Sequence, residues 1–189
     1  MRATAHDVST EHYRLSRVEY DRAVERGAFK PEARLELVDG DLHAMTPEGS
    51  RHALAMNLVA EQLRRVFTNG FHVRVQNPVA LDDYSEPEPD VSVVEGAMRD
   101  YRDAHPASPV LVVEVSDDSV RYDRTVKQRL YARARIPDYW ILAVRDARLE
   151  VYREPGEDGY QSVTRLGAGE TVAPLQRPDA RIAVDDLLP

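Results

Sequence analysis

Hydrophobic and polar residues follow one another along this chain in patterns that predict three helices and a series of strands. Helices are expected over residues 16–26, over about 17 residues that begin at 47–50, and over 123–135. Alternating or continuous apolar runs predict strands at 73–81, 89–94, 109–115, 139–144, 149–152, 160–166, 171–173 and 181–184. This order indicates an α/β (α+β) fold, with a mixed β-sheet flanked by helices and additional N- and C-terminal β-strands.

Short sequence motifs locate the start of the first helix and a hairpin turn. Ser16 and Glu19 have the spacing of a capping box, which marks the start of the first helix. Asp39-Gly40 lies between apolar residues and predicts a tight hairpin over 34–45. We expect one domain over residues 1–189, with its core at about 34–153 and a C-terminal β extension over 154–189.

Composition narrows the class of protein. The 189 residues are 42% hydrophobic and 31% charged, which excludes a disordered chain. The chain has no cysteine, so disulfide scaffolds, thiolate zinc sites and cysteine nucleophiles are excluded. No apolar run has membrane-spanning length, and the N-terminus lacks an apolar signal core. We therefore expect a cytoplasmic protein without a membrane partner.

The net charge of −8 argues against general nucleic-acid binding, which depends on neutralising phosphates. The basic residues are unevenly placed, however. Six of the 25 fall within residues 121–135, where Asp123 is the single acid. A charge run is usually only a solvated face, but this one makes Arg121 and Arg124 candidates for contacting a phosphate backbone.

Glu114 is a carboxylate inside an otherwise apolar strand, and such burial is costly unless the charge is paired or binds a metal. Asp90 begins the preceding strand, so pairing of the two strands as a hairpin would bring both carboxylates to one point. Two carboxylates without a His or Cys cluster favour a hard cation, Mg²⁺ or Mn²⁺. The alternative is structural, with Asp90 capping a strand and Glu114 paired with an arginine.

Lys127 is one of only two lysines among the 25 basic residues. Helical spacing turns it toward the sheet, beside the apolar stripe of its helix. It can form an ordinary helix pair with Asp123, or it can stand beside a metal-bound water and a phosphate. The scarcity of lysine favours the second interpretation.

Five blocks of the sequence, in this order and spacing, resemble the Uma-two family of endonucleases in the PD-(D/E)xK, or restriction-endonuclease-like, superfamily. They are residues 36–40, 89–94, 112–119, 122–132 and 136–142. The resemblance implies a restriction-endonuclease-like core. It also implies metal binding by Asp90 and Glu114, with the Val115 carbonyl as a further ligand. Ser116 stands where the superfamily has its lysine, so the resemblance implies that Lys127 supplies it from the following helix.

Three further residues are candidates for the same site. The resemblance implies that Glu36 is a supporting or second-metal carboxylate, although it could equally be a paired hairpin residue. It also places His52 near the site, where the alternative is a surface histidine. Gln76 could orient substrate from a strand beside the cleft, although a plain edge-strand role is the simpler interpretation.

The resulting hypothesis is a Mg²⁺-dependent (or Mn²⁺-dependent) endonuclease acting on DNA phosphodiesters. Asp90 and Glu114 would bind the metal, and Lys127 would orient or deprotonate water. Two alternatives stay open: a catalytically inactive nucleic-acid-binding or assembly protein with a nuclease-like fold, and a metal-dependent enzyme acting on a small phosphorylated substrate. A homodimer is expected, since two sites would then meet two strands.

Overall fold

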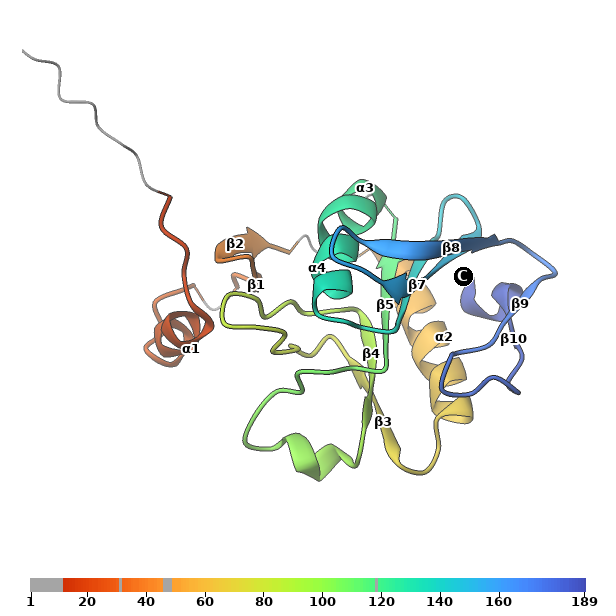
Figure 1. The fold of residues 1–189 in the computed structure, drawn as a ribbon, viewed down its shortest axis with the longest axis horizontal. Helices are drawn as coiled ribbons and strands as arrows, with labels where there is room; N and C mark the ends of the chain where they lie inside the picture. The colour runs from red at the N-terminus through yellow and green to blue at the C-terminus, as the bar shows by residue number, and fades with distance from the viewer. Residues whose placement is uncertain (1–11, 31, 46–48, 118) are drawn as a thin grey trace, which may run out of the picture.

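A computed structural model describes residues 12–30, 32–45, 49–117 and 119–189, and it contains a six-stranded mixed sheet (Figure 1). The strands lie in the order β3-β4-β5-β6-β7-β8. Their bounds are Phe71–Val75 (β3), Val91–Glu95 (β4), Leu111–Ser116 (β5), Asp138–Ala143 (β6), Arg148–Pro155 (β7) and Tyr160–Leu166 (β8). Strands β5 and β6 are parallel, and all other neighbours are antiparallel. The predicted α/β class with a mixed sheet flanked by helices is confirmed.

Helices pack against the six-stranded sheet, and buried apolar residues within the described ranges form two core clusters. Helix α2 (Ser50–Val66) packs its apolar side against one face, together with Leu111, Val113 and Val115 of β5. The parallel connection from β5 to β6 is helical, running through α3 (Val120–Tyr122), a π-helical turn labelled η2 (Asp123–Lys127) and α4 (Gln128–Arg133). Val112 belongs to the second core cluster, with Tyr131 of α4. Since successive side chains of a strand point to opposite faces, Glu114 shares the face of Val112 and points toward this helix.

Smaller elements lie around the main sheet. Strands β1 (Leu35–Val38) and β2 (Asp41–Ala44) form the predicted hairpin, and β9 (Thr171–Val172) and β10 (Ile182–Ala183) form a second pair. The turn between β1 and β2 has positive φ at Asp39 (54°) and Gly40 (86°), as the favoured two-residue hairpin turn requires. The remaining elements are α1 (Arg17–Glu25) and the 3-10 turns η1 (Met98–Tyr101) and η3 (Val184–Leu187).

Some predicted bounds were wrong. The strand expected over 73–81 ends at Val75, because Gln76 has φ 48° and Pro78 lacks the amide that a ladder needs. Gln76 therefore lies outside any strand. The helix expected from residue 123 begins at Val120. Pro47, part of the predicted start of the second helix, lies outside the described residues, and α2 begins at Ser50. In the described ranges, no helix combines the length and the apolar character needed to span a bilayer.

Candidate active site

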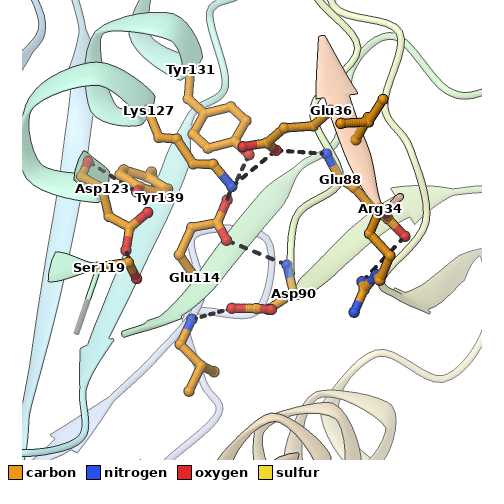
Figure 2. Close-up of polar contacts among 12 residues, drawn as sticks. Arg34, Glu36, Glu88, Asp90, Glu114, Ser119, Asp123, Lys127, Tyr131 and Tyr139 are labelled. Carbon is orange, nitrogen blue, oxygen red and sulfur yellow. Dashed lines mark hydrogen bonds and ion pairs between the residues drawn. The ribbon is translucent and has the colours of Figure 1, made fainter. Parts of the chain in front are cut away.

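A cleft lies where the β1–β2 hairpin, the start of α2, strand β5 and the helical crossover meet. It is lined by side chains that are mostly polar or charged: Glu36, His43, Ala44, Met45, His52, Glu88, Asp90, Glu114, Val115, Ser119, Tyr122, Asp123 and Lys127. Figure 2 shows the carboxylates of Glu36 and Glu114 converging on the ammonium of Lys127.

Asp90 and Glu114 meet at the floor of this cleft because β4 and β5 are antiparallel. Val91 pairs with Val113, so Asp90 and Glu114 lie one residue further along the same register. The amide of Val115 donates a hydrogen bond to Asp90 Oδ2 (2.7 Å), and the amide of Asp90 donates to Glu114 Oε2 (3.4 Å). The expected hairpin therefore forms, and it brings the two carboxylates together.

Lys127 reaches the same point from the helical crossover, with only 5% of its surface exposed. Its Nζ lies 3.0 Å from Glu114 Oε1 and 3.2 Å from Glu36 Oε2 (Figure 2). The hydroxyl of Tyr131 also donates to Glu114 Oε1, at 2.7 Å. Glu36 accepts a second hydrogen bond, from the amide of Glu88 at 3.2 Å. Lys127 therefore joins β1 to β5 through two buried ion pairs.

The π-helical turn determines which side chains of the crossover face the cleft. The amide of Gln128 bonds to the carbonyl of Asp123, five residues back. Asp123 and Lys127 are both buried there and both line the cleft. Ser119 donates a hydrogen bond to the Asp123 carboxylate at 3.0 Å, and the Tyr139 hydroxyl donates to its main-chain carbonyl at 3.2 Å. Single π-helical turns of this kind often occur at functional sites.

Negative charge exceeds positive charge in this buried cluster. Lys127 contacts the carboxylates of Glu36 and Glu114, and the charges of Asp90 and Asp123 also act on it. Burial raises the pKa of Glu114, although Lys127 opposes this rise. Burial also raises the pKa of Asp123. Burial alone would lower the pKa of Lys127, but Glu114 and Glu36 hold it well above its ordinary value. A cation bound here would offset the excess negative charge.

The other predicted site residues take different positions. His52, in the first turn of α2, lines the cleft with Nε2 3.1 Å from Asp90 Oδ1. Glu36 lines it as the second partner of Lys127. Gln76 is not among the cleft-lining residues, and its amide donates a hydrogen bond to the carbonyl of Asp90 at 3.0 Å. Gln76 therefore contacts the site through its main chain.

The two predicted backbone-binding arginines lie on different sides of the crossover. Arg124 donates two hydrogen bonds to Glu150 of β7, at 3.0 and 2.8 Å, away from the cleft-lining residues. Arg121 is exposed in a small hollow with Ser119, Tyr122 and Thr125, and the first two of these also line the cleft. Arg121 is therefore near the mouth of the cleft, whereas Arg124 is engaged on β7.

Sequence reasoning missed several residues that the fold brings to the cleft. Asp123 had a signal in its spacing from Lys127, but that spacing suggests only a helix pair. Tyr122 precedes the predicted helix and had no signal. His43 and Glu88 come from a hairpin and a loop, and only the tertiary arrangement brings them to the crossover.

The donor set determines which metal could fit. Among the described residues, no three His, Asp or Glu side chains are grouped so that they could hold a metal ion. The oxygen groups of the cleft that could hold a cation include the carboxylates of Asp90 and Glu114 and the main-chain carbonyl of Val115. Mg²⁺ commonly binds through one or two carboxylates, several waters and substrate phosphates, so this hard oxygen set fits it. Structural zinc sites usually have four Cys or His ligands, whereas this cleft has no cysteine and is lined by more carboxylates than histidines.

Comparison with solved structures finds the same fold in another protein. The structure is similar to that of a protein from Anabaena variabilis described as "a putative nuclease belonging to DUF820". The TM-score is 0.67 at 14% sequence identity, and the match covers 84% of this chain and 92% of the other. A search of curated proteins found no match. The model of the Uma2 family, described as "Putative restriction endonuclease", matches residues 17–185, and the chain belongs to this family.

Proposed function

We propose that this protein is a divalent-metal-dependent endonuclease that hydrolyses DNA phosphodiester bonds. Asp90 and Glu114, with the Val115 carbonyl, would hold Mg²⁺ or Mn²⁺, and Lys127 would act on the attacking water. Membership of the Uma2 family and the nuclease fold support the reaction class. The metal, the DNA substrate and the residue roles are our proposal.

One observation carries the assignment. Two carboxylates and the buried lysine meet at the base of one cleft, with Lys127 Nζ 3.0 Å from Glu114 Oε1 and Asp90 hydrogen-bonded to the next residue, Val115. Phosphodiester hydrolysis needs a metal-binding pair and a positive group near the developing charge. A degenerate site would have no reason to keep four carboxylates around a single buried ammonium.

The residues divide the chemistry between them. A metal bound by Asp90 and Glu114 would polarise the phosphate and lower the pKa of a bound water. Lys127 is held as a cation between two carboxylates. We therefore assign it to orienting water and offsetting charge on the phosphate rather than to taking a proton. Glu36 would position the ammonium, and His52 would position the Asp90 carboxylate from the other side.

The wider proposal follows the same reasoning. Arg121, exposed beside the cleft mouth, would contact the phosphate backbone, and Arg124 would do so only if it left Glu150. We further propose a single domain over residues 1–189, a homodimer in solution, and a cytoplasmic location in keeping with the absence of cysteine.

Cleavage of DNA tests the proposal. Supercoiled plasmid and short duplexes are incubated with Mg²⁺ or Mn²⁺ and the wild type, Asp90→Asn or Lys127→Met. We expect metal-dependent nicking by the wild type and a loss of at least about 100-fold in each variant, the size seen when one charge-stabilising group is removed. Thermal unfolding of each variant separates lost chemistry from lost structure.

A matched control is present in the chain. Lys30 is the other lysine and is exposed, so Lys30→Ala should cleave as the wild type does. If the wild type binds DNA but never cuts it with either metal, the catalytically inactive binding protein is the better description. If it cuts only small phosphorylated compounds, the DNA assignment is wrong.

A further inference from the structure

Tyr122 has a hydroxyl for which the protein provides no partner. The residue is the last of α3, directly before the π-helical turn, and it lines the cleft with Glu36 and Lys127. Its oxygen is buried and accepts or donates no hydrogen bond in the structure of the described chain. Buried hydroxyls are normally paired, so an unpaired one in a substrate cleft needs an explanation.

The surroundings of this hydroxyl are those of the proposed catalytic cluster. Burial raises the pKa of the Tyr122 hydroxyl, and the negative charge of Glu36 raises it further. The hydroxyl therefore stays protonated and can donate a hydrogen bond. Glu36 and Glu114 accept from Lys127, and Asp123 accepts from Ser119. Each of these carboxylates thus already accepts from another donor, and none of them accepts from the Tyr122 hydroxyl. A bound ligand would supply the acceptor that the Tyr122 hydroxyl lacks.

His43 lies beside Tyr122 among the residues that line the cleft. The ring of His43, from β2, lies 5.5 Å from the ring of Tyr122, and His43 is only half-buried. Its hairpin forms a two-stranded sheet of its own rather than part of the six-stranded sheet. His43 therefore packs beside Tyr122 from a hairpin that is not part of the main sheet.

We infer that Tyr122 is a substrate-binding residue whose hydroxyl donates a hydrogen bond to a nonbridging phosphate oxygen of the strand held in the cleft. The inference rests on the proposed function, because it takes the substrate to be a phosphodiester. A phosphate oxygen is a charged acceptor, and hydrogen bonds to charged groups are the stronger kind. Arg121, beside Tyr122 at the edge of the cleft, would contact the next part of the same backbone.

The test uses Tyr122→Phe, which removes only the oxygen, and measures binding rather than cleavage. Affinity for a fluorescent oligonucleotide is determined in EDTA, so that no metal is needed. We expect affinity to fall about tenfold or more. The thermal midpoint should stay the same or rise, because no hydrogen bond within the protein is lost. Tyr84→Phe is the control, since its exposed ring lies outside the cleft, and it should bind as the wild type does.

Substituted oligonucleotides locate the contact. Each phosphate in turn is replaced by a methylphosphonate, which lacks one charged oxygen. At one position we expect the wild type to lose affinity while Tyr122→Phe loses none further, as non-additivity of contacting groups requires. If the losses add at every position, if the variant binds as tightly as the wild type, or if it merely unfolds earlier, the inference is wrong, and a bound water then suffices to pair the hydroxyl.

The two proposals fail in different ways. Weaker binding by Tyr122→Phe together with no cleavage by the wild type would refute the nuclease and keep the phosphate contact. Metal-dependent cleavage that is identical in the wild type and Tyr122→Phe would refute the contact and keep the nuclease. A wild type that neither binds nor cuts any oligonucleotide, with or without Mg²⁺, would refute both.

Discussion

Glu86 is a buried carboxylate outside the candidate active site, and its surroundings compensate its charge poorly. Its side chain is 5% exposed, and Oε2 lacks a hydrogen bond. Arg17 Nη1 lies 3.8 Å away and His105 Nε2 lies 4.0 Å away, but burial lowers the pKa of His105 and so disfavours its charged form. Burial raises the pKa of Glu86 to about 7, Asp21 adds to the rise, and Arg17 opposes it.

This environment makes stability depend on pH. Between its ordinary pKa of 4.5 and about 7, the folded protein holds a proton on Glu86 that the unfolded chain releases. The stabilisation is present below pH 4.5 and is lost as the pH rises through 7. Glu86→Gln should therefore have a higher thermal midpoint than the wild type at pH 8, and the gap should shrink as the pH falls from 7 to 4.5.

Thermal unfolding of both proteins between pH 4 and pH 8 measures this gap. Glu61→Gln is the control, because Glu61 is an exposed partner of Arg65 on α2, and its effect should be small across the range. A Glu86→Gln protein that is less stable than the wild type at pH 8 would show that the ion pairs with Arg17 and His105 outweigh the cost of burial.

Helix α1 is stabilised at its N-terminus by a capping box. Ser16 accepts a hydrogen bond from the amide of Glu19, and the Glu19 carboxylate accepts one from the amide of Ser16 at 2.9 Å. The reciprocal bonds satisfy two amides that a helix start would leave unpaired. Tyr20 anchors the helix by donating to the carbonyl of Leu35, at the start of β1.

We expect Ser16→Ala to destabilise α1 by about 1 kcal/mol, the usual cost of losing such a cap. The effect should be local, because α1 packs at the edge of the molecule (Figure 1). Hydrogen exchange of the α1 amides should speed up about fivefold, while exchange in β5 stays unchanged. Ser108→Ala, in an exposed loop, is the control. Equal acceleration in α1 and β5 would mean that the cap supports the whole domain.

Charge at the scale of the whole molecule limits how DNA can be held. Four of the six basic residues over 121–135 are engaged within the protein: Arg124 with Glu150, Lys127 with Glu36 and Glu114, Arg133 with Asp39, and Arg135 with the carbonyl of Pro155. Within the ranges the structure describes, Arg121 and Arg129 have no acidic partner. The net charge of −8 adds a general repulsion.

Binding of DNA should accordingly depend only weakly on salt. If Arg121 and Arg129 each neutralise one phosphate, the logarithm of the binding constant should fall with the logarithm of salt concentration with a slope of about −2. Arg121→Ala should reduce the slope by about 1. Fluorescence anisotropy titrations at salt concentrations from about 50 to about 200 mM measure the slopes of the wild type and of Arg121→Ala. A slope near −5 would mean that the internal ion pairs open on binding.

The fold was predictable to different degrees at these scales. The apolar run of β5 and the turn at Asp39-Gly40 depend on neighbours in the chain, so pattern alone located them. The end of β3 was misplaced, because alternation continues past Val75 while the main chain turns at Gln76. The π-helical turn had no signal in the sequence, since the spacing of Asp123 and Lys127 suits an ordinary helix equally well.

The sequence predicted which residues belong to the candidate site better than it predicted how those residues contact one another. A carboxylate in an apolar strand and one of two lysines stand out from composition alone, so Glu114 and Lys127 could be singled out. Their geometry could not, because the distance between Glu114 and Lys127 depends on the π-helical turn that separates them in the chain. Tyr122 is an unremarkable residue in the sequence, and only the absence of a partner for its buried hydroxyl singles it out.

By itself, the sequence determined the class of fold, the strands β4 and β5, and the presence of a carboxylate inside the apolar β5, because periodicity and turn chemistry are local properties of the chain. The tertiary structure alone decided that Glu36 shares Lys127 with Glu114, that His52 faces Asp90, and that Arg124 turns to Glu150. These contacts join residues far apart in the chain. They depend on how strands and helices pack, and no local pattern encodes that.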